Sequence, residues 1–200
     1  MQKVGVRDID DFIPKKRREE LANRLNRLIV TTPSFFEGLR VDDVDTLLEP
    51  EGKDATIAII NLADIPSFEE RASIVSHAAY AIYNWMKKKG TATVPRLLVY
   101  LDEIGGGGGK EAFFPSYPFN PVSKAPLQLL LRQGRAFGVS CIFATQNPGD
   151  IDYKALSNCQ TWIIGRLGTK RDRDKILEGI SEAELGEDVK QKMADKITAL

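Results

Sequence analysis

Two adjacent carboxylates, Asp102 and Glu103, end an apolar run and are the residues best placed to do chemistry. The preceding residues, 97–101 (LLVYL), predict a buried parallel strand. The carboxyl end of such a strand lies at the edge where open α/β sheets bind ligands. At that edge, one acid can hold Mg²⁺ and its neighbour can activate a water molecule. The pair therefore predicts a phosphate-transfer site.

A strand that ends in an acid pair is the pattern of a Walker B motif. Such a site also needs a phosphate-binding loop, GxxxxGK[ST], and nothing in residues 1–96 fits it. The run 105–110 (GGGGGK) is no substitute, because it follows the strand. Ile104 also stands at its first-glycine position, and Glu111 stands where Ser or Thr should bind Mg²⁺. We interpret 105–109 as a flexible loop.

The aromatic residues 113–117 (FFPSY) leave two interpretations open. They could contact a partner or stack on a base. They could also fold back as a lid over the edge of the sheet, which is the interpretation we favour.

The composition excludes several classes of protein. The 28 basic residues balance the 28 acidic ones, so no overall positive field would attract nucleic acid, although a local patch is compatible with this balance. No apolar run has membrane-spanning length and no secretory signal is present, so we expect a cytoplasmic protein. With a single histidine, and with Cys141 and Cys159 in no ligand spacing, we expect no zinc site.

Strand and helix patterns alternate along the chain, which predicts an α/β fold with a mostly parallel sheet flanked by helices. The predicted strands are 56–63, 97–101, 139–145 and 161–167, and the predicted helices are 15–29, 67–89, 124–137, 170–179 and 181–200. Capping boxes at Ser67 and Ser181 mark two of the helix starts. We expect a helical or irregular segment at 1–54, a core at 55–180 and a terminal helix at 181–200.

Polar groups follow three of the predicted strands: the acid pair, then Gln146, then Arg166. Taken singly, an acid pair can be a helix cap, Gln146 part of a turn and Arg166 a surface charge. Because parallel strands end at one edge of a sheet, we expect the three groups to converge. Together they favour a nucleotide site.

Three stretches resemble the HerA/FtsK superfamily of P-loop ATPases: LLVYLDEI, RQGRAFGV and ATQNP. The closer resemblance is to HerA-like ATP-binding proteins, and it covers residues 55–180. It implies a RecA-like core in a hexameric ring that couples hydrolysis of Mg²⁺-bound ATP to translocation or processing of DNA. Double-stranded DNA and an accessory nuclease are the partners that it implies, with no membrane attachment.

The resemblance also implies roles for individual residues. Asp102 would hold Mg²⁺ through water, Glu103 would polarise the attacking water, and Gln146 would be the γ-phosphate sensor. Arg166 and Arg135 are both candidates for an arginine finger across a subunit interface, a group worth ~10³–10⁵ in rate. The choice stays open, since Arg135 could instead brace its helix and its neighbour Arg132 is an equal alternative.

Without the phosphate-binding loop, we expect this chain to be the C-terminal portion of a motor ATPase, with its fold incomplete at the N-terminal side. One face or edge of the sheet would then be exposed. The chain alone should be inactive. Two alternatives stay open: a non-catalytic scaffold that retains the P-loop NTPase fold, and a motor for conjugation or secretion.

Overall fold

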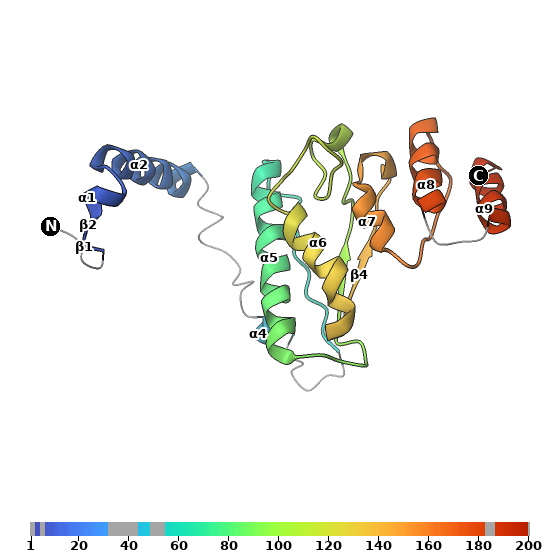
Figure 1. The fold of residues 1–200 in the computed structure, drawn as a ribbon, viewed down its shortest axis with the longest axis horizontal. Helices are drawn as coiled ribbons and strands as arrows, with labels where there is room; N and C mark the ends of the chain where they lie inside the picture. Colours follow the sequence, from blue (N-terminus) through green and yellow to red (C-terminus); the bar gives the residue numbers. More distant parts are fainter. Residues whose placement is uncertain (1–2, 5–6, 32–43, 49–54, 183–186, 200) are drawn as a thin grey trace. The chain divides into compact units, whose positions relative to one another are not determined.

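The computed structural model describes the chain except for residues 1–2, 5–6, 32–43, 49–54, 183–186 and 200 (Figure 1). It divides into two compact units, Met1–Arg40 and Val41–Leu200. The fold is α/β, with a small parallel sheet and helices. The division that we expect at residues 54 and 180 stays a prediction.

The first unit is a small hairpin followed by a long helix. Strands β1 (Lys3–Val4) and β2 (Arg7–Asp8) pair antiparallel, and the short helix α1 (Ile9–Phe12) follows directly. Helix α2 (Lys15–Thr31) confirms the helix predicted at 15–29. Arg18 fastens its start by donating to the carbonyl of Ile13 and pairing with Asp10.

The second unit is built on two parallel strands. β3 (Leu97–Leu101) pairs with β4 (Val139–Phe143) in register from Leu97↔Val139 to Leu101↔Phe143, which confirms the parallel arrangement. The other elements of this unit are α4 (Val44–Leu48), α5 (Phe68–Lys89), η1 (Gly107–Gly109), α6 (Lys124–Gln133), η2 (Gly134–Phe137), η3 (Pro148–Asp150), α7 (Tyr153–Asn158), α8 (Lys170–Glu182) and α9 (Glu187–Ala199). In the described residues no helix has the length and apolar content needed to cross a membrane.

Local signals set the ends of α5. Ser67 caps its start by accepting a hydrogen bond from the Glu70 N–H at 3.3 Å, as the capping pattern predicts. Three lysines fill the last turn, where positive charge suits the helix dipole, and Gly90 follows with a φ of 74°. The predicted range 67–89 is confirmed.

The segment from α6 to β4 also follows the sequence prediction. Leu127 and Leu130 are buried on one face of α6, and the chain turns into β4 at Gly138 in the left-handed conformation, φ 74°. A Cβ at Gly138 would stand 2.6 Å from the carbonyl oxygen of Val94, so only glycine fits this turn.

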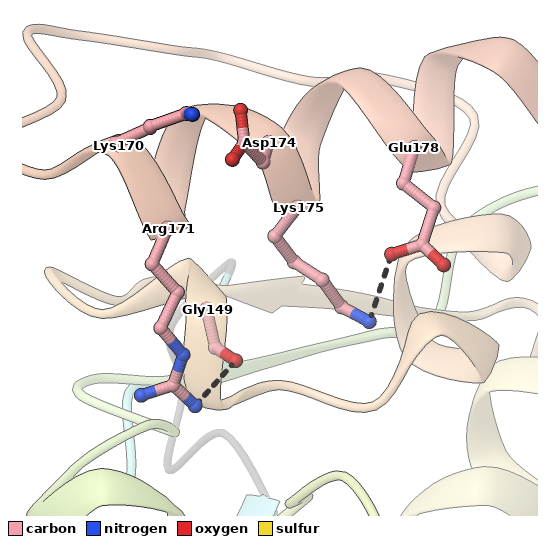
Figure 2. Close-up of a pocket in the computed structure, with 6 residues that line it drawn as sticks. All are labelled: Gly149, Lys170, Arg171, Asp174, Lys175 and Glu178. Atoms are coloured by element: carbon pink, nitrogen blue, oxygen red, sulfur yellow. Dashed lines mark hydrogen bonds and ion pairs between the residues drawn. The ribbon is translucent and has the colours of Figure 1, made fainter.

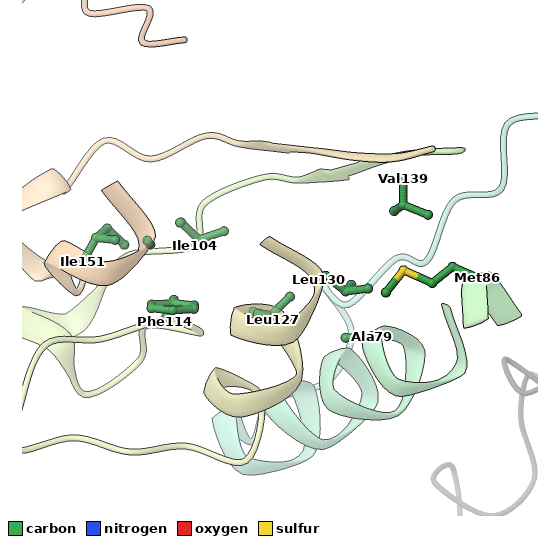
Figure 3. Packing of buried hydrophobic residues seen from close by; sticks show 9 residues of the cluster. Ala79, Met86, Ile104, Phe114, Leu127, Leu130, Val139 and Ile151 are labelled. Carbon is green, nitrogen blue, oxygen red and sulfur yellow. The ribbon is translucent and has the colours of Figure 1, made fainter. Parts of the chain in front are cut away.

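The core lies on one face of the sheet, against α5 and α6 (Figure 3). Met86, Phe114 and Leu130 are almost fully buried there. On the opposite face Leu98 and Tyr100 stay 57% and 59% exposed. The prediction that β3 is a buried strand is therefore right for one face only, because the helices that pack on this sheet lie on one side.

Two predicted strands are wrong. Residues 56–63 and 161–167 have no strand structure, and Ile57 and Ile163 are 88% and 98% exposed. A strand forms only where a neighbouring strand accepts its backbone hydrogen bonds, and in the described residues β3 and β4 pair only with each other. The 161–167 segment instead packs alternate side chains, including Trp162 and Ile164, on α8 and α9.

The predicted start of the last helix is also wrong. Ser181 lies inside α8, and α9 begins at Glu187. The other half of the expected capping box, Glu184, falls outside the described residues. Met193 and Ile197 of α9 pack in a cluster with Ile176 of α8, whereas Val189 of the same helix is 48% exposed.

Lys124 fastens the long loop 105–122 to the core. Its Nζ donates to the carbonyl of Pro115 at 2.7 Å and pairs with Asp152 at 2.6 Å. Burial alone would raise the pKa of Asp152, but the hydrogen bonds from Lys124 and from the Lys154 N–H hold it below its ordinary value. The pair is mostly buried, with exposed fractions of 15% and 9%.

Removing the Lys124 side chain should destabilise the fold. We expect Lys124→Ala to lower the free energy of unfolding by about 3 kcal/mol, because it leaves the Asp152 carboxylate buried without its partner. Urea denaturation measures the change, and Lys110→Ala, at an exposed lysine of the same loop, is the control.

The same pair should make stability depend on pH. Since the pKa of Asp152 is lowered in the fold, its contribution is present above the ordinary carboxyl pKa and is lost as the pH falls through the folded value. Lys124→Ala should lose less stability than the wild type over that acid range. Equal losses in both proteins would contradict this assignment.

Candidate functional site

The ends of β3 and β4 bring Glu103 and Gln146 together. The Oε1 atom of Glu103 accepts hydrogen bonds from the backbone N–H of Gln146 at 3.3 Å and from the Thr145 hydroxyl at 3.4 Å. The Asn147 side-chain amide is the third donor, at 3.5 Å. This convergence follows from the parallel pairing, which puts both strand ends at one edge.

The backbone of Glu103 is strained. Its φ of 51° is the only positive value at a non-glycine residue in the described part of the chain. Such a conformation costs on the order of 1–3 kcal/mol and persists only where surrounding contacts hold it. The chain therefore turns sharply at Glu103, with its carboxylate directed to the end of β4.

Glycine at position 105 allows the chain after Glu103 to pack closely against Thr145 and Asn147. A Cβ at this position would stand 2.8 Å from Thr145 Oγ1 and 2.9 Å from the carbonyl oxygen of Asn147. The following glycines form the short helix η1, with positive φ angles at Gly107, Gly108 and Gly109. The run interpreted as a flexible loop is thus a folded turn in the structure.

Asp102 has a different environment from its neighbour. Its side chain is exposed, and it accepts a hydrogen bond from the Tyr100 hydroxyl at 3.3 Å. The Asp102 charge, together with partial burial and this hydrogen bond, raises the pKa of the Tyr100 phenol above its ordinary value. In the described residues no cluster of three or more ligating side chains could hold a metal ion by itself. A single exposed carboxylate does fit Mg²⁺, which keeps several waters and takes other ligands from substrate phosphates.

The aromatic loop folds back onto the core. Phe114 is fully buried and Phe113 is partly buried, so for these residues the lid-like interpretation agrees with the structure. Tyr117 is 92% exposed and is the part of the loop that a partner could reach.

Neither candidate arginine contacts the acid pair. Arg166 is exposed on the extended segment before α8. Arg135 lies on η2, which precedes β4 and is therefore at the opposite end of the sheet, and it donates to the Gln160 side chain at 3.2 Å. Arg132 is exposed on α6. An arginine finger at any of these positions stays a prediction.

Sequence reasoning missed the residues that fix the end of β4. The sequence predicts Thr145 only as the last residue of the strand 139–145, and Asn147 only as part of the turn that follows it. Asp172 of α8 accepts from the Gly149 N–H at 3.0 Å, and Thr169 caps the same helix. The spacing Thr169-x-x-Asp172 is a readable capping signal, but nothing in the sequence points to its contact with Gly149.

Replacing Asp102 should shift the titration of Tyr100. In Asp102→Asn the pKa of the phenol should fall toward its ordinary value, because the largest cause of its increase is the aspartate charge. The phenolate absorbance as a function of pH measures this. Tyr100→Phe identifies the contribution of this tyrosine, and an unchanged high-pH transition in Asp102→Asn would contradict the contact.

Gly105→Ala should destabilise the fold by roughly 1–3 kcal/mol, the usual cost of forcing an extra methyl into a packed site. The methyl would push against backbone at Asn147 and should also move the Gln146 amide resonance. Gly165→Ala is the matched control, because a Cβ there meets nothing within 4 Å. Equal stabilities of the two variants would show that the site tolerates the added methyl.

Comparison with known proteins gives distant relatives. No protein-family model matches the chain. It is 30% identical over 162 residues to the DNA translocase FtsK of Helicobacter pylori strain J99, and 26% identical over 182 residues to the DNA double-strand break repair helicase HerA of Sulfurisphaera tokodaii. These matches cover 76% and 88% of the chain but only 18% and 33% of the relatives' own lengths. The chain is thus distantly similar to motor ATPases of the FtsK/HerA type.

Proposed function

We propose that this chain carries the hydrolytic acid pair and sensor of a HerA/FtsK-like motor, which couples ATP hydrolysis to translocation or processing of DNA. The observation that carries the proposal is the contact between Glu103 and the Gln146 N–H at the carboxyl edge of two parallel strands. The similarity to a DNA translocase and a DNA repair helicase supports DNA as the polymer on which the motor acts.

Each residue at this edge has a distinct part in the proposal. When bound, Mg²⁺-ATP supplies the phosphoryl group and part of the charge that stabilises its transfer. Asp102, exposed beside Tyr100, would hold Mg²⁺ through water. Glu103, fixed through Oε1, orients and polarises the attacking water with its other oxygen, and Gln146 monitors the terminal phosphate.

The two candidate arginine fingers, Arg166 and Arg135, would act only in an assembled ring. Arg166 and Arg135 are both exposed, so a neighbouring copy could present either one to the nucleotide. We propose a hexameric ring on double-stranded DNA, with an accessory nuclease as a further partner. A RecA-like core would supply the remaining strands of the sheet.

A scaffold that retains the fold without catalysis is the second candidate. The observation that favours it is the lack of a GxxxxGK[ST] motif in the 200 residues. The coding region upstream of residue 1 discriminates the two: an in-frame phosphate-binding loop supports the motor. A natural start at Met1 supports the scaffold or a two-chain enzyme.

The 200-residue chain should hydrolyse ATP negligibly, because the lysine and backbone cradle that bind the triphosphate are missing from it. Phosphate release with Mg²⁺ and duplex DNA should equal that of Glu103→Gln. A clear Mg²⁺-dependent rate that Glu103→Gln abolishes would overturn this expectation.

In a longer polypeptide that includes a phosphate-binding loop, Glu103→Gln should lower kcat for ATP hydrolysis about 10²–10⁴-fold with little change in KM, as expected for loss of a general base. Glu111→Gln, at an exposed acid of the neighbouring loop, is the control. Equal rates for the two variants would refute the role of Glu103.

A further inference from the structure

The first turn of α8 is clamped to η3, the turn that follows the candidate site (Figure 2). Both backbone polar groups of Gly149 are engaged: its N–H donates to Asp172 Oδ1 at 3.0 Å and its carbonyl accepts from Arg171 Nη2 at 3.2 Å. Arg171 also pairs at 3.1 Å with Asp150, whose side chain is 6% exposed. We call this set of contacts, made by Arg171 and Asp172 with Gly149 and Asp150, the α8 clamp.

The clamp is held from the side of α8 as well. Thr169 Oγ1 donates to Asp172 Oδ2 at 2.6 Å and accepts from the Asp172 N–H at 3.2 Å. A Cβ at Gly149 would stand 2.9 Å from Asp172 Oδ1. A side chain at residue 149 would therefore displace the Asp172 carboxylate, which Thr169 holds in place.

Hydrogen bonds connect the clamp to Glu103. The Asp150 N–H donates to the carbonyl of Asn147 at 3.1 Å, and the Asn147 N–H donates to Thr145 Oγ1 at 2.9 Å. Thr145, Gln146 and Asn147 then donate to Glu103. A displacement of Gly149 and Asp150 would therefore alter the donors around the Glu103 carboxylate.

We propose that Asp172 and Arg171 are positioning residues for the candidate site: they hold the turn that keeps Gln146 and Asn147 against Glu103. The clamp also couples this edge to the 161–169 segment, which carries Arg166 and leads directly into α8. The proposal rests on the proposed function only for the statement that a nucleotide binds at this edge. The coupling itself is a property of the chain without ligand.

Amide hydrogen exchange tests the coupling. In Asp172→Ala the Gly149 and Gln146 amides should exchange about tenfold faster than in the wild type, because a hydrogen bond to a charged acceptor is lost at the clamp. Asp172→Asn keeps an acceptor oxygen and should restore most of the protection. Asp174→Ala removes an exposed aspartate of the same helix and should leave both amides unchanged.

A role limited to capping α8 gives a different result. Asp172→Ala would then accelerate exchange in the first turn of α8 and leave Gln146 at its wild-type rate, which overturns the proposal. The amide of Leu130, a buried residue of helix α6, reports loss of the whole fold. If exchange at Leu130 accelerates as much as exchange at Gln146, the Asp172→Ala result reflects loss of the whole fold. Arg171→Gln then tests the proposal, because this change leaves the Thr169–Asp172 cap in place.

For Arg171→Gln we expect exchange to accelerate more at Gln146 than at Leu130, each relative to the wild type. Lys170→Ala, at an exposed lysine, is the control. The proposal is overturned where exchange at Gln146 and at Leu130 accelerates by the same factor, relative to the wild type, in both Asp172→Ala and Arg171→Gln. Exchange needs no nucleotide, so a failure of the proposed function would appear in the hydrolysis assay and leave this result unaffected.

Discussion

The in-register parallel pairing of β3 with β4 is the constraint on which the candidate site depends. Leu101 pairs with Phe143, and the ladder continues past both strands because Ala144 donates to Leu101 and Ile104 donates to Ala144. These hydrogen bonds fix the register of the two strands, and with it the relative positions of the polar residues that follow each strand. A slip of one residue would turn every side chain of a strand to the other face and remove Glu103 from the end of β4.

One covered face is enough to hold this register. Phe114 and Ile151 close the core beneath the edge of the site, where loop 105–122 meets η3. The loop is held there by directional contacts as well as by apolar ones, since Lys124 binds the Pro115 carbonyl and the Asp152 carboxylate together. The long glycine- and proline-rich loop is therefore part of the support of the site.

The sequence predicts those parts of the structure that have local causes. The limits of α5 follow from the Ser67 cap, and the turn into β4 follows from Gly138. Strand propensity at 56–63 and 161–167 is misleading, because a strand also needs a neighbouring strand to pair with, and local composition does not supply one. In the site, strand-end positions predict that Glu103 and Gln146 meet, whereas the Asp172–Gly149 contact joins distant segments and has no local signal.

The two adjacent carboxylates differ because the backbone turns between them. Asp102 directly follows β3 and stays exposed beside Tyr100, whereas Glu103 has a φ of 51° and faces three donors from the end of β4. A strand that continued in a regular conformation would put the second acid on the opposite face without those donors. Different environments give paired carboxylates different tasks, so in the proposed function the strained turn at Glu103 would let Asp102 meet a hydrated cation while Glu103 orients a water molecule.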